Sequence, residues 1–286
     1  MSRLRCYPAL FSLLLVTSGF AAGESTPPPL TLRIMTYNIQ VAGTNPPLWP
    51  QRRPVMKELL LRENPDIIGT QEGRYEQLKD LAVDLPTHDW IGLGREGGSR
   101  NEFMAIFYRR DRFEPLAYDH FWLSDTPDVI GSITWGTRYR RMVTWARFRD
   151  RPTGRVFEVW NTHFDHEVEM ARQKSAALVR QRLAATDPAL PLVFTGDFNC
   201  AGGASVPYTE LTEGAGLTDT WTAAARRTNE DLDTYNGHQP ALRNGRRIDW
   251  ILARRPTAVS EAAILDFTSP TLAPSDHFPV TATVKF

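Results

Sequence analysis

The stretch Leu192-Val193-Phe194-Thr195-Gly196-Asp197-Phe198-Asn199 joins an apolar run to a turn that carries a carboxylate and a carboxamide. The apolar part predicts a strand over 192–195, and the run over 66–69 predicts another. Continuous rather than alternating apolar runs of this kind are typical of strands covered on both faces. The spacing of Asp197 and Asn199 puts both side chains on one side of the chain, with the phenylalanine between them turned into the core. An Asx turn that closes the strand explains the same pattern.

Further short apolar runs alternate with a few helical patterns along the rest of the chain. We therefore expect an α/β fold in which two stacked sheets are flanked by helices. The expected strands cover residues 32–37, 66–69, 103–108, 143–148, 156–161, 192–195, 248–252 and 280–286, and the expected helices cover 54–63, 75–85 and 167–184.

The first 23 residues have the pattern of an export signal. Arg3 and Arg5 precede an apolar stretch over 9–16, and small residues follow near a plausible cleavage point. A buried N-terminal helix is the alternative. We expect a signal peptide over 1–23, a Pro-rich linker over 24–30, and a single domain over 31–286 that is exported to the periplasm or secreted.

The predicted mature chain is nearly neutral. Lys and Arg total 33, as do Asp and Glu, so removing Arg3 and Arg5 leaves 31 basic against 33 acidic residues. A neutral chain lacks the basic footprint on which non-specific DNA binding depends. Cys6 lies in the predicted signal, which leaves Cys200 alone and excludes an internal disulfide. We interpret Cys200 as a small packed residue rather than a nucleophile.

Other polar turns border apolar runs in the same way. They are Met35-Thr36-Tyr37-Asn38, Gln71-Glu72 and Ser275-Asp276-His277. Carboxylate and carboxamide oxygens suit Mg²⁺, which completes its shell with water and substrate phosphate. A metal-dependent phosphoesterase is therefore the first hypothesis. Taken singly, Asn38 is also a common turn former, and Glu72 also suits the start of a helix.

Two histidines are each expected to contact an acidic residue that is distant in the sequence. Asp249 is an isolated acid in an apolar strand, and a buried acid needs a partner, so we expect it to pair with His277. A purely structural pair is the alternative. His163 ends another strand, and Glu102 is placed to orient it. Two such pairs suit a reaction that needs a general acid and a general base.

A zinc site is the competing interpretation of the sequence around His163. His163, Asp165 and His166 offer three ligands within four residues. We rank this site lower, because zinc sites are usually completed by further His or Cys ligands.

The segment 118–141 predicts a long loop in which aromatic residues are interleaved with arginines. Arg138 and Arg141 are expected to contact a phosphate of the substrate, with Tyr139 beside them. A surface loop with a few packed aromatic residues explains the composition equally well.

In sequence order, the motifs resemble those of the endonuclease/exonuclease/phosphatase superfamily, which includes DNase I, neutral sphingomyelinases and inositol polyphosphate 5-phosphatases. The similarity runs from residue 32 to residue 286. It is strongest to exported bacterial metal-dependent hydrolases. The motifs are Tyr37-Asn38, Gln71-Glu72, Glu102, Asn161-Thr162-His163, Gly196-Asp197-Phe198-Asn199, Arg247-Ile248-Asp249 and Ser275-Asp276-His277.

The resemblance implies a four-layer αββα sandwich with two mixed or antiparallel sheets. It also implies a Mg²⁺ site, with Mn²⁺ as an alternative ion. Glu72 would be the principal metal ligand, helped by Asn38 and Asp276.

For the catalytic residues, the resemblance implies that Asp197 polarises the attacking water and that Asn199 holds this water and a phosphate oxygen. His277, fixed by Asp249, would donate to the phosphoryl oxygens. His163, oriented by Glu102, would serve the leaving group or the phosphate.

From these residues we predict a phosphodiesterase resembling a nuclease, which acts as a monomer without a stable protein partner. Its substrate would be a nucleic acid or a nucleotide. A phosphatase or phosphodiesterase acting on lipid head groups or inositol phosphates is the alternative. An inactive binding module is the more remote one, because such a module has no physical need of the whole polar set.

Overall fold

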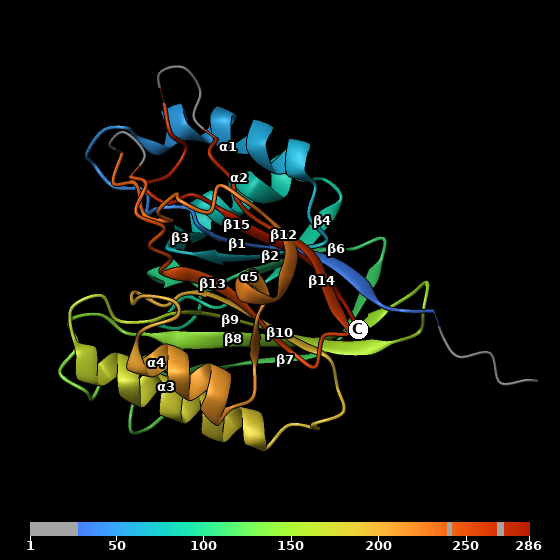
Figure 1. The fold of residues 1–286 in the computed structure, drawn as a ribbon. Coiled ribbons are helices and arrows are strands. Elements are labelled where there is room, and N and C mark those ends of the chain that lie inside the picture. The colour runs from blue at the N-terminus through green and yellow to red at the C-terminus, as the bar shows by residue number, and fades with distance from the viewer. Residues whose placement is uncertain (1–27, 239–241, 268–271) are drawn as a thin grey trace, which may run out of the picture.

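The computed structural model describes residues 28–238, 242–267 and 272–286 (Figure 1). The predicted signal peptide over 1–23 and residues 24–27 of the predicted linker lie outside the described residues. Within the described part, no helix combines the length and the apolar character needed to cross a bilayer.

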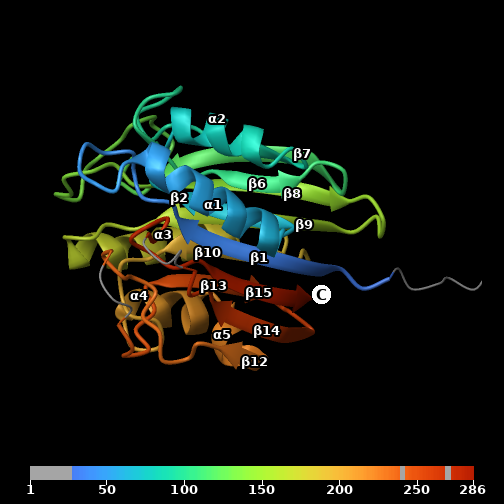
Figure 2. The ribbon, with the colours of Figure 1, turned by 90° about the horizontal axis from the view of Figure 1, so that it is seen from above.

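Two mixed sheets form the centre of the molecule. In one, the strand order is β12-β14-β15-β1-β2-β6-β4, and in the other it is β11-β13-β10-β9-β8-β7. Helices α1 and α2 lie outside the first sheet and α3 lies outside the second (Figures 1 and 2). The fold is therefore an α/β, four-layer αββα sandwich, and the predicted fold class is confirmed.

The elements of the first sheet and its helices are, in chain order, β1 (Thr31–Asn38), α1 (Trp49–Glu63), β2 (Ile67–Gln71), α2 (Tyr75–Asp84), β4 (His88–Ile91), β6 (Ile106–Arg109), β12 (Ala224–Thr228), β14 (Ala258–Ile264) and β15 (Val280–Lys285). Those of the second sheet and its helices are β7 (Phe113–Trp122), β8 (Met142–Asp150), β9 (Val156–His163), α3 (Glu169–Ala184), β10 (Leu192–Asp197), α4 (Val206–Thr209), η1 (Glu210–Gly214), β11 (Thr218–Asp219), α5 (Thr220–Ala223) and β13 (Asp249–Arg254). A separate two-stranded ladder joins β3 (Gly73–Arg74) to β5 (Glu102–Phe103).

The alternation of side chains along each strand produces the layers. On β1, Leu32 and Ile34 enter the apolar core between the sheets, whereas Met35 and Tyr37 pack in the cluster under α1 and α2. All five residues of β2 are buried, as are all six of β10. The continuous apolar runs are thus covered on both faces, as predicted.

Polar side chains tie the two sheets together at one end of the core. Asn161 of β9 accepts hydrogen bonds from Gln71 Nε2 at 2.8 Å and Thr195 Oγ1 at 3.1 Å, and its own amide donates to the carbonyl of Thr70. The sheets approach so closely here that a Cβ on Gly69 would lie 2.1 Å from Thr195 Oγ1. Only glycine fits at that position, and the network fixes the strand ends that follow it.

Several predicted boundaries are wrong for identifiable reasons. The strand predicted over 103–108 is two strands, because β5 pairs with β3 and β6 joins the first sheet. Helix α1 begins at Trp49 rather than at residue 54, since Pro50 takes the first-turn position. Helix α3 begins at Glu169 rather than 167, because the Asp165 carboxylate accepts from the backbone of residues 167 and 168.

Strands β7 and β14 also differ from the prediction. The loop predicted over 118–141 begins only at residue 123, because residues 118–122 belong to β7. Pro115 interrupts the register of this edge strand, and the strand has many exposed side chains. β14 has a similar register shift between Val259 and Glu261. These features hide the alternation on which strand prediction depends.

Candidate active site

The sheet register brings the polar strand ends together. β1 and β2 run parallel, as do β9 and β10, so their carboxyl ends share one edge of the sandwich. In the second sheet, Asp197 lies opposite His163 on one neighbouring strand and opposite Asp249 on the other. Residues far apart in the chain therefore meet at the end of the molecule where ligands bind in open α/β sheets.

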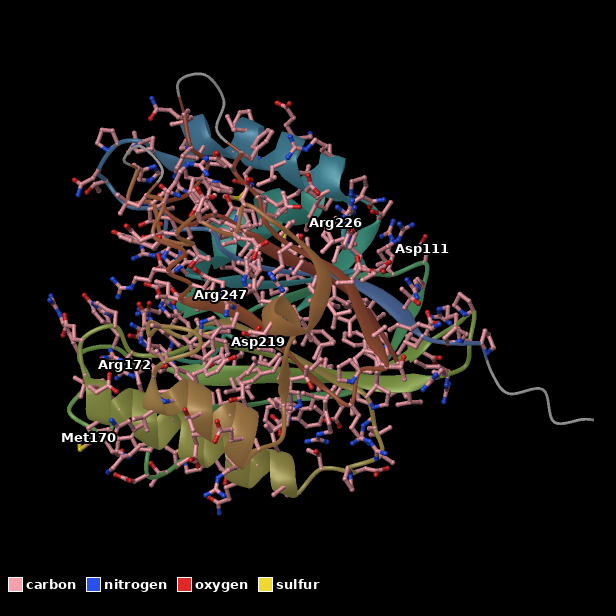
Figure 3. All side chains as sticks on the ribbon, in the orientation of Figure 1. Asp111, Met170, Arg172, Asp219, Arg226 and Arg247 are labelled. Carbon is pink, nitrogen blue, oxygen red and sulfur yellow. The ribbon has the colours of Figure 1, made fainter. Side chains whose placement is uncertain are left out.

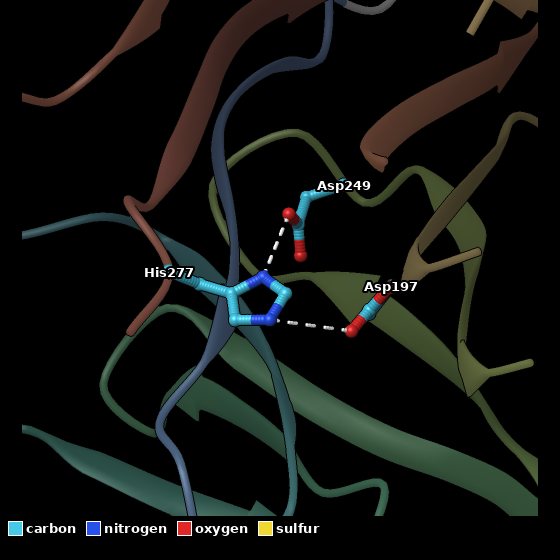
Figure 4. Close-up of side chains that lie close together, drawn as sticks. All are labelled: Asp197, Asp249 and His277. Carbon is cyan, nitrogen blue, oxygen red and sulfur yellow. Dashed lines mark hydrogen bonds and ion pairs between the residues drawn. The ribbon is translucent and has the colours of Figure 1, made fainter. Parts of the chain in front are cut away.

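His277 lies between two carboxylates (Figure 4). Its Nδ1 is 2.9 Å from Asp249 Oδ2, and its Nε2 is 3.7 Å from Asp197 Oδ2. The Tyr235 ring packs edge-on against the imidazole at 5.1 Å. The predicted contact between Asp249 and His277 is thus present, and the imidazole is 5% exposed.

The two site histidines have opposite protonation preferences. Burial lowers the pKa of His277, but the charges of Asp249 and Asp197 outweigh this effect and raise the pKa well above its usual value. Burial together with the nearby charges of Arg141 and Arg95 lowers the pKa of His163 well below its usual value. The site therefore holds one imidazolium and one neutral imidazole.

Asp197 lies between these two histidines. Its Oδ2 is 3.4 Å from His163 Nε2 and accepts a hydrogen bond from Asn38 Nδ2 at 3.0 Å. Burial and then the charge of Asp249 raise the pKa of Asp197 to about 7, against the opposing charge of His277. A carboxyl group with such a pKa exchanges a proton near neutral pH, as a general base must.

The structure does not make the predicted contact between Glu102 and His163. Glu102 Oε1 accepts from Arg95 Nη2 at 2.8 Å, whereas His163 Nδ1 is buried without a hydrogen-bond partner among the described residues. The reason lies in the short β3–β5 ladder, which turns Glu102 toward Arg95. Sequence gives no sign of this ladder, because it is only two residues long.

Glu72 and Asn38 lie side by side next to these residues. Asn38 Nδ2 donates to Glu72 Oε1 at 3.1 Å, and Glu72 Oε2 accepts from the backbone N–H of Val41 at 3.0 Å. Asn38 Oδ1 accepts from the backbone of Gln40. Glu72 and Gln40 both adopt positive φ, at 66° and 55°. Such conformations are costly for these residues.

A buried arginine holds the loops that carry these side chains. Arg52 of α1 is 1% exposed and donates only to backbone carbonyl oxygens within the described part of the chain. Two of these, on Ile39 and Pro274, are 2.8 and 2.9 Å from its Nη1. Arg52 thus ties the segment after Asn38 to the segment before Asp276.

The donor set fits a hard divalent cation. Glu72 and Asp276 line one cavity. Burial raises the pKa of Asp276, the charge of His277 opposes this, and the charge of Glu72 adds to it. Two carboxylates that repel each other in one cavity, with an amide beside them, match the oxygen ligands that Mg²⁺ prefers.

A second arrangement also meets the distance requirement for a metal. Ligand atoms of Asp197, Asp249 and His277 lie within 4.8 Å of one another. We interpret these three residues as a histidine that is ion-paired with two carboxylates rather than as a metal site. Nδ1 of His277 already bonds to Asp249, and the raised pKa of His277 favours an imidazolium, which has no lone pair to give to a metal.

The site opens into a cavity of about 720 Å³. Asn199 faces it with a φ of 51°, and its Nδ2 donates to the carbonyl of Phe164. The aromatic side chain of Phe198 is buried and stacks on Trp250 at 4.2 Å, as the spacing of the turn predicts. The cavity wall is formed by Val41, Glu72, Arg74, Arg95, Glu102, Tyr139, Arg141, His163, His166, Asp197, Asn199, Asp233, Tyr235, Leu242, Arg246, Ile248, Asp276 and His277.

The two arginines predicted to bind substrate differ in position. Arg141 lines the cavity and is 4% exposed. Arg138 is exposed and lies with its guanidinium 5.3 Å from the Tyr139 ring. Sequence analysis missed Arg95 and Tyr235, because neither stands in a polar strand-end motif.

The alternative ligands around His163 turn to other partners. Asp165 accepts from the backbone of residues 167 and 168, just before α3, and His166 Nδ1 accepts from Arg141 Nη2 at 2.8 Å. Cys200 is buried, and burial raises the pKa of its thiol to about 12. The thiol stays protonated, in keeping with a packing role.

A buried ion pair supports the strand that presents Asp249. Arg247 donates to Asp219 Oδ2 at 2.8 Å just before β13 begins, and both side chains are labelled in Figure 3. A Cβ on Gly202 would lie 2.9 Å from Trp250 Nε1 and 3.1 Å from Arg247 Nη2. This close packing fixes where the strand starts and therefore where Asp249 lies.

Comparison with known proteins agrees with this geometry. The model of the endonuclease/exonuclease/phosphatase family matches residues 35–277. The chain belongs to this family.

The solved structures of two proteins from Bacteroides thetaiotaomicron are similar over nearly their whole length. A mannosyl-6-phosphatase superposes with a TM-score of 0.84 at 33% identity, covering 89% of this chain and 100% of that one. A further endonuclease/exonuclease/phosphatase family protein gives 0.84 at 32% identity, covering 91% and 99%.

Among curated sequences, an uncharacterized protein of Acanthamoeba polyphaga mimivirus is 32% identical over 162 residues. The match covers 53% of this chain and 59% of the viral protein. The chain thus spans about three fifths of the length of this relative.

Proposed function

We propose that this protein is a metal-dependent phosphoesterase that hydrolyses a phosphomonoester of a small, hydroxyl-rich molecule such as a sugar. One observation carries the reaction class. A charged His277 and a neutral His163 flank Asp197 in the cavity that also holds the carboxylates of Glu72 and Asp276. Acid, base and a place for a hard cation are the requirements of phosphoryl transfer to water.

Two observations support a small monoester. The cavity volume of about 720 Å³ is that of a site for one small ligand. The mannosyl-6-phosphatase to which the chain is 33% identical acts, by its name, on a phosphorylated sugar. The phosphodiester predicted from the sequence stays a prediction, and so does export from the cell.

In the proposed reaction, Asp197 Oδ2 takes a proton from the attacking water. Asn199 orients that water and a phosphate oxygen. His277, charged and held by Asp249 at 2.9 Å, donates from Nε2 to the phosphoryl oxygens as negative charge builds up. The neutral His163 contacts Asp197 Oδ2 through Nε2 at 3.4 Å and keeps that carboxylate in place. Asp197 then releases the proton to solvent, and the departing oxygen takes up a proton from solvent to leave as a hydroxyl group. Mg²⁺ held by Glu72, Asp276 and Asn38 would stabilise the charge on the phosphate and the departing oxygen.

A substrate panel tests this proposal. Mannose 6-phosphate, glucose 6-phosphate, p-nitrophenyl phosphate, inositol phosphates, bis-(p-nitrophenyl) phosphate, sphingomyelin, plasmid DNA and RNA would be assayed with Mg²⁺, Mn²⁺ or EDTA. We expect phosphate release from the sugar monoesters with Mg²⁺ and none with EDTA. His277→Ala protein is the control for contaminating phosphatase.

Cleavage of the diesters without the monoesters would contradict the proposal and favour the phosphodiesterase predicted from the sequence. Monoester hydrolysis that survives EDTA would remove the metal from the mechanism. The outcome therefore separates the reaction class from the identity of the substrate.

A further inference from the structure

Two buried arginines on one wall of the cavity hydrogen-bond to none of the residues that carry a step of the proposed reaction, although their charges help to keep His163 neutral. Arg95 is 3% exposed and Arg141 is 4% exposed, yet both line the cavity. Buried guanidinium groups are costly unless their charge and their donors are matched. The hydrogen-bond acceptors that these guanidinium groups have, and those that they lack, therefore indicate the kind of ligand that this wall binds.

The protein satisfies each guanidinium only in part. Arg95 donates from Nε to Asn101 Oδ1 at 3.1 Å and from Nη2 to Glu102. Arg141 donates from Nη2 to His166 and reaches Asp165 only at 3.5 Å. Among the described residues, the Nη1 atoms of both arginines have no protein acceptor. Neither guanidinium is fully paired, in contrast to Arg52.

Positive charge is also concentrated at this wall. The guanidinium carbons of Arg95, Arg138 and Arg141 lie 5.3, 5.3 and 6.0 Å from the centre of the Tyr139 ring. Glu102 pairs with Arg95 and Asp165 with Arg141, which leaves Arg138 without an ion-pair partner among the described residues. An anion bound here would supply the acceptors and the charge that the wall lacks.

The two arginines do not hydrogen-bond to the residues around Asp197. Those residues are Asn38, His163 and His277, whose side-chain nitrogens lie 3.0, 3.4 and 3.7 Å from Asp197 Oδ2. The hydrogen bonds of Arg95 and Arg141 run instead to Asn101, Glu102, Asp165 and His166.

We propose that Arg95 and Arg141 form a second anion subsite, which binds an anionic group of the substrate other than the phosphate that is hydrolysed. The inference rests on the proposed phosphoesterase function and narrows its substrate class. The substrate is a phosphomonoester that carries a second phosphate or a carboxylate, such as a sugar bisphosphate or a phosphorylated sugar acid.

The test compares matched substrates on matched variants. Glucose 6-phosphate has no second anionic group, glucose 1,6-bisphosphate has a second phosphate, and 6-phosphogluconate has a carboxylate. Arg246 is the control, because it is an exposed cation that also lines the cavity. We expect the wild-type kcat/KM to be about 10 to 100 times higher for a substrate with a second anionic group than for glucose 6-phosphate. This is the range given by one or two charge-assisted hydrogen bonds.

Arg95→Gln and Arg141→Gln should each reduce this preference about tenfold, Arg95→Lys should reduce it less, and Arg246→Gln should leave it unchanged. Thermal melting of each variant checks folding. Arg141 is buried and bonds to the segment just before α3, so Arg141→Gln is the variant that risks not folding. In that case the comparison of Arg95→Gln with Arg95→Lys decides whether the subsite exists.

Two results would overturn the inference while the proposed function stands. The wild type would show no preference for a second anionic group, or Arg95→Gln would lower kcat/KM for all three substrates equally. If no phosphoester is hydrolysed, the proposed function fails instead. Calorimetric titration of glucose 1,6-bisphosphate in EDTA then still decides the subsite, since Arg95→Gln should weaken this binding about tenfold and an unchanged affinity would refute it.

Discussion

His277 and His88 are equally buried, at 5% exposure each, but they lie at opposite ends of the sandwich and prefer opposite charge states. His277 contacts Asp249 where the parallel strands end. His88 begins β4 at the other end, with Nε2 2.8 Å from the carbonyl oxygen of Pro65 and Nδ1 3.1 Å from Thr87 Oγ1. Burial lowers the pKa of His88, whereas the carboxylates raise that of His277.

The comparison teaches that burial alone does not determine the role of a polar side chain here. At the end with His88, aromatic residues such as Tyr108 and Phe148 fill the space between the sheets. At the end with His277, strands β1, β2, β9 and β10 finish in an amide, a histidine or a carboxylate. One end of the sandwich is built for stability, and the other holds costly groups for chemistry.

The largest expected effect is on catalysis at the polar end. His277→Ala and Asp197→Ala should each lower kcat at least 10² to 10³-fold, the usual range for removing one positioned donor, with the protein still folded. Steady-state kinetics and circular dichroism measure the two properties. His88→Gln is the matched control, because it alters an equally buried histidine and should lower stability without changing kcat. A His277→Ala enzyme with near wild-type turnover would remove that residue from the mechanism.

The apolar end should behave in the opposite way. Phe148 is fully buried, and its ring packs 4.9 Å from Tyr108 and 5.7 Å from Phe157. Phe148→Ala should reduce the free energy of unfolding by about 3–5 kcal/mol through lost burial and the cavity left behind, while kcat at 25 °C stays within about twofold of wild type. Urea unfolding and kinetics on the same preparation test this. A large loss of kcat in the folded variant would mean that the two ends are not independent.

The hydrogen bonds of Asn161, which lie between the two ends, should affect both stability and kcat to a moderate extent. Asn161→Ala removes one hydrogen bond each from Gln71 Nε2 and from the carbonyls of Thr70 and Ala105. We expect a loss of about 1–3 kcal/mol in unfolding free energy and a fall of about tenfold in kcat, because Glu72 and His163 follow the two tied strands. Thr195→Val, which removes one weaker bond to Asn161, is the milder control. If neither variant changes kcat, the network is purely structural.

The smallest effect is on the pH dependence of stability. The pKa of His88 is lower in the folded protein than its ordinary value of 6.5. The neutral form therefore stabilises the fold above pH 6.5, and this contribution is lost as the pH falls below 6.5. Urea unfolding at pH 7.5 and 5.5 should show a smaller acid-induced loss in His88→Gln than in the wild type. Equal losses in both proteins would contradict the assigned charge state.

Sequence predicts the parts of this molecule that depend on local pattern. The buried strands, three helices and the polar strand ends follow from periodicity and from the chemistry of Asn38, Glu72 and Asp197. The contact of Asp249 with His277 follows from the need of a buried acid for a partner. The edge strand β7 does not follow from the sequence, because Pro115 and the exposed residues of the strand obscure the alternation.

The cavity walls depend on contacts that no local pattern records. Glu102 pairs with Arg95 rather than His163 because of a two-residue ladder. Tyr235 reaches His277 from a segment that has no regular secondary structure. Positions of this kind are set by the tertiary fold. The sequence therefore predicts the polar residues at the strand ends but not the residues that line the rest of the cavity.

Calorimetric titration of Mg²⁺ into the wild type, Glu72→Gln and Asp249→Asn proteins tests the central claim, that Glu72 belongs to the metal site while Asp249 serves the histidine. We predict saturable binding to the wild type, at least tenfold weaker binding to Glu72→Gln, and nearly unchanged binding to Asp249→Asn. The account would be contradicted if the folded wild type did not bind Mg²⁺. It would also be contradicted if Asp249→Asn lost Mg²⁺ binding while Glu72→Gln kept it.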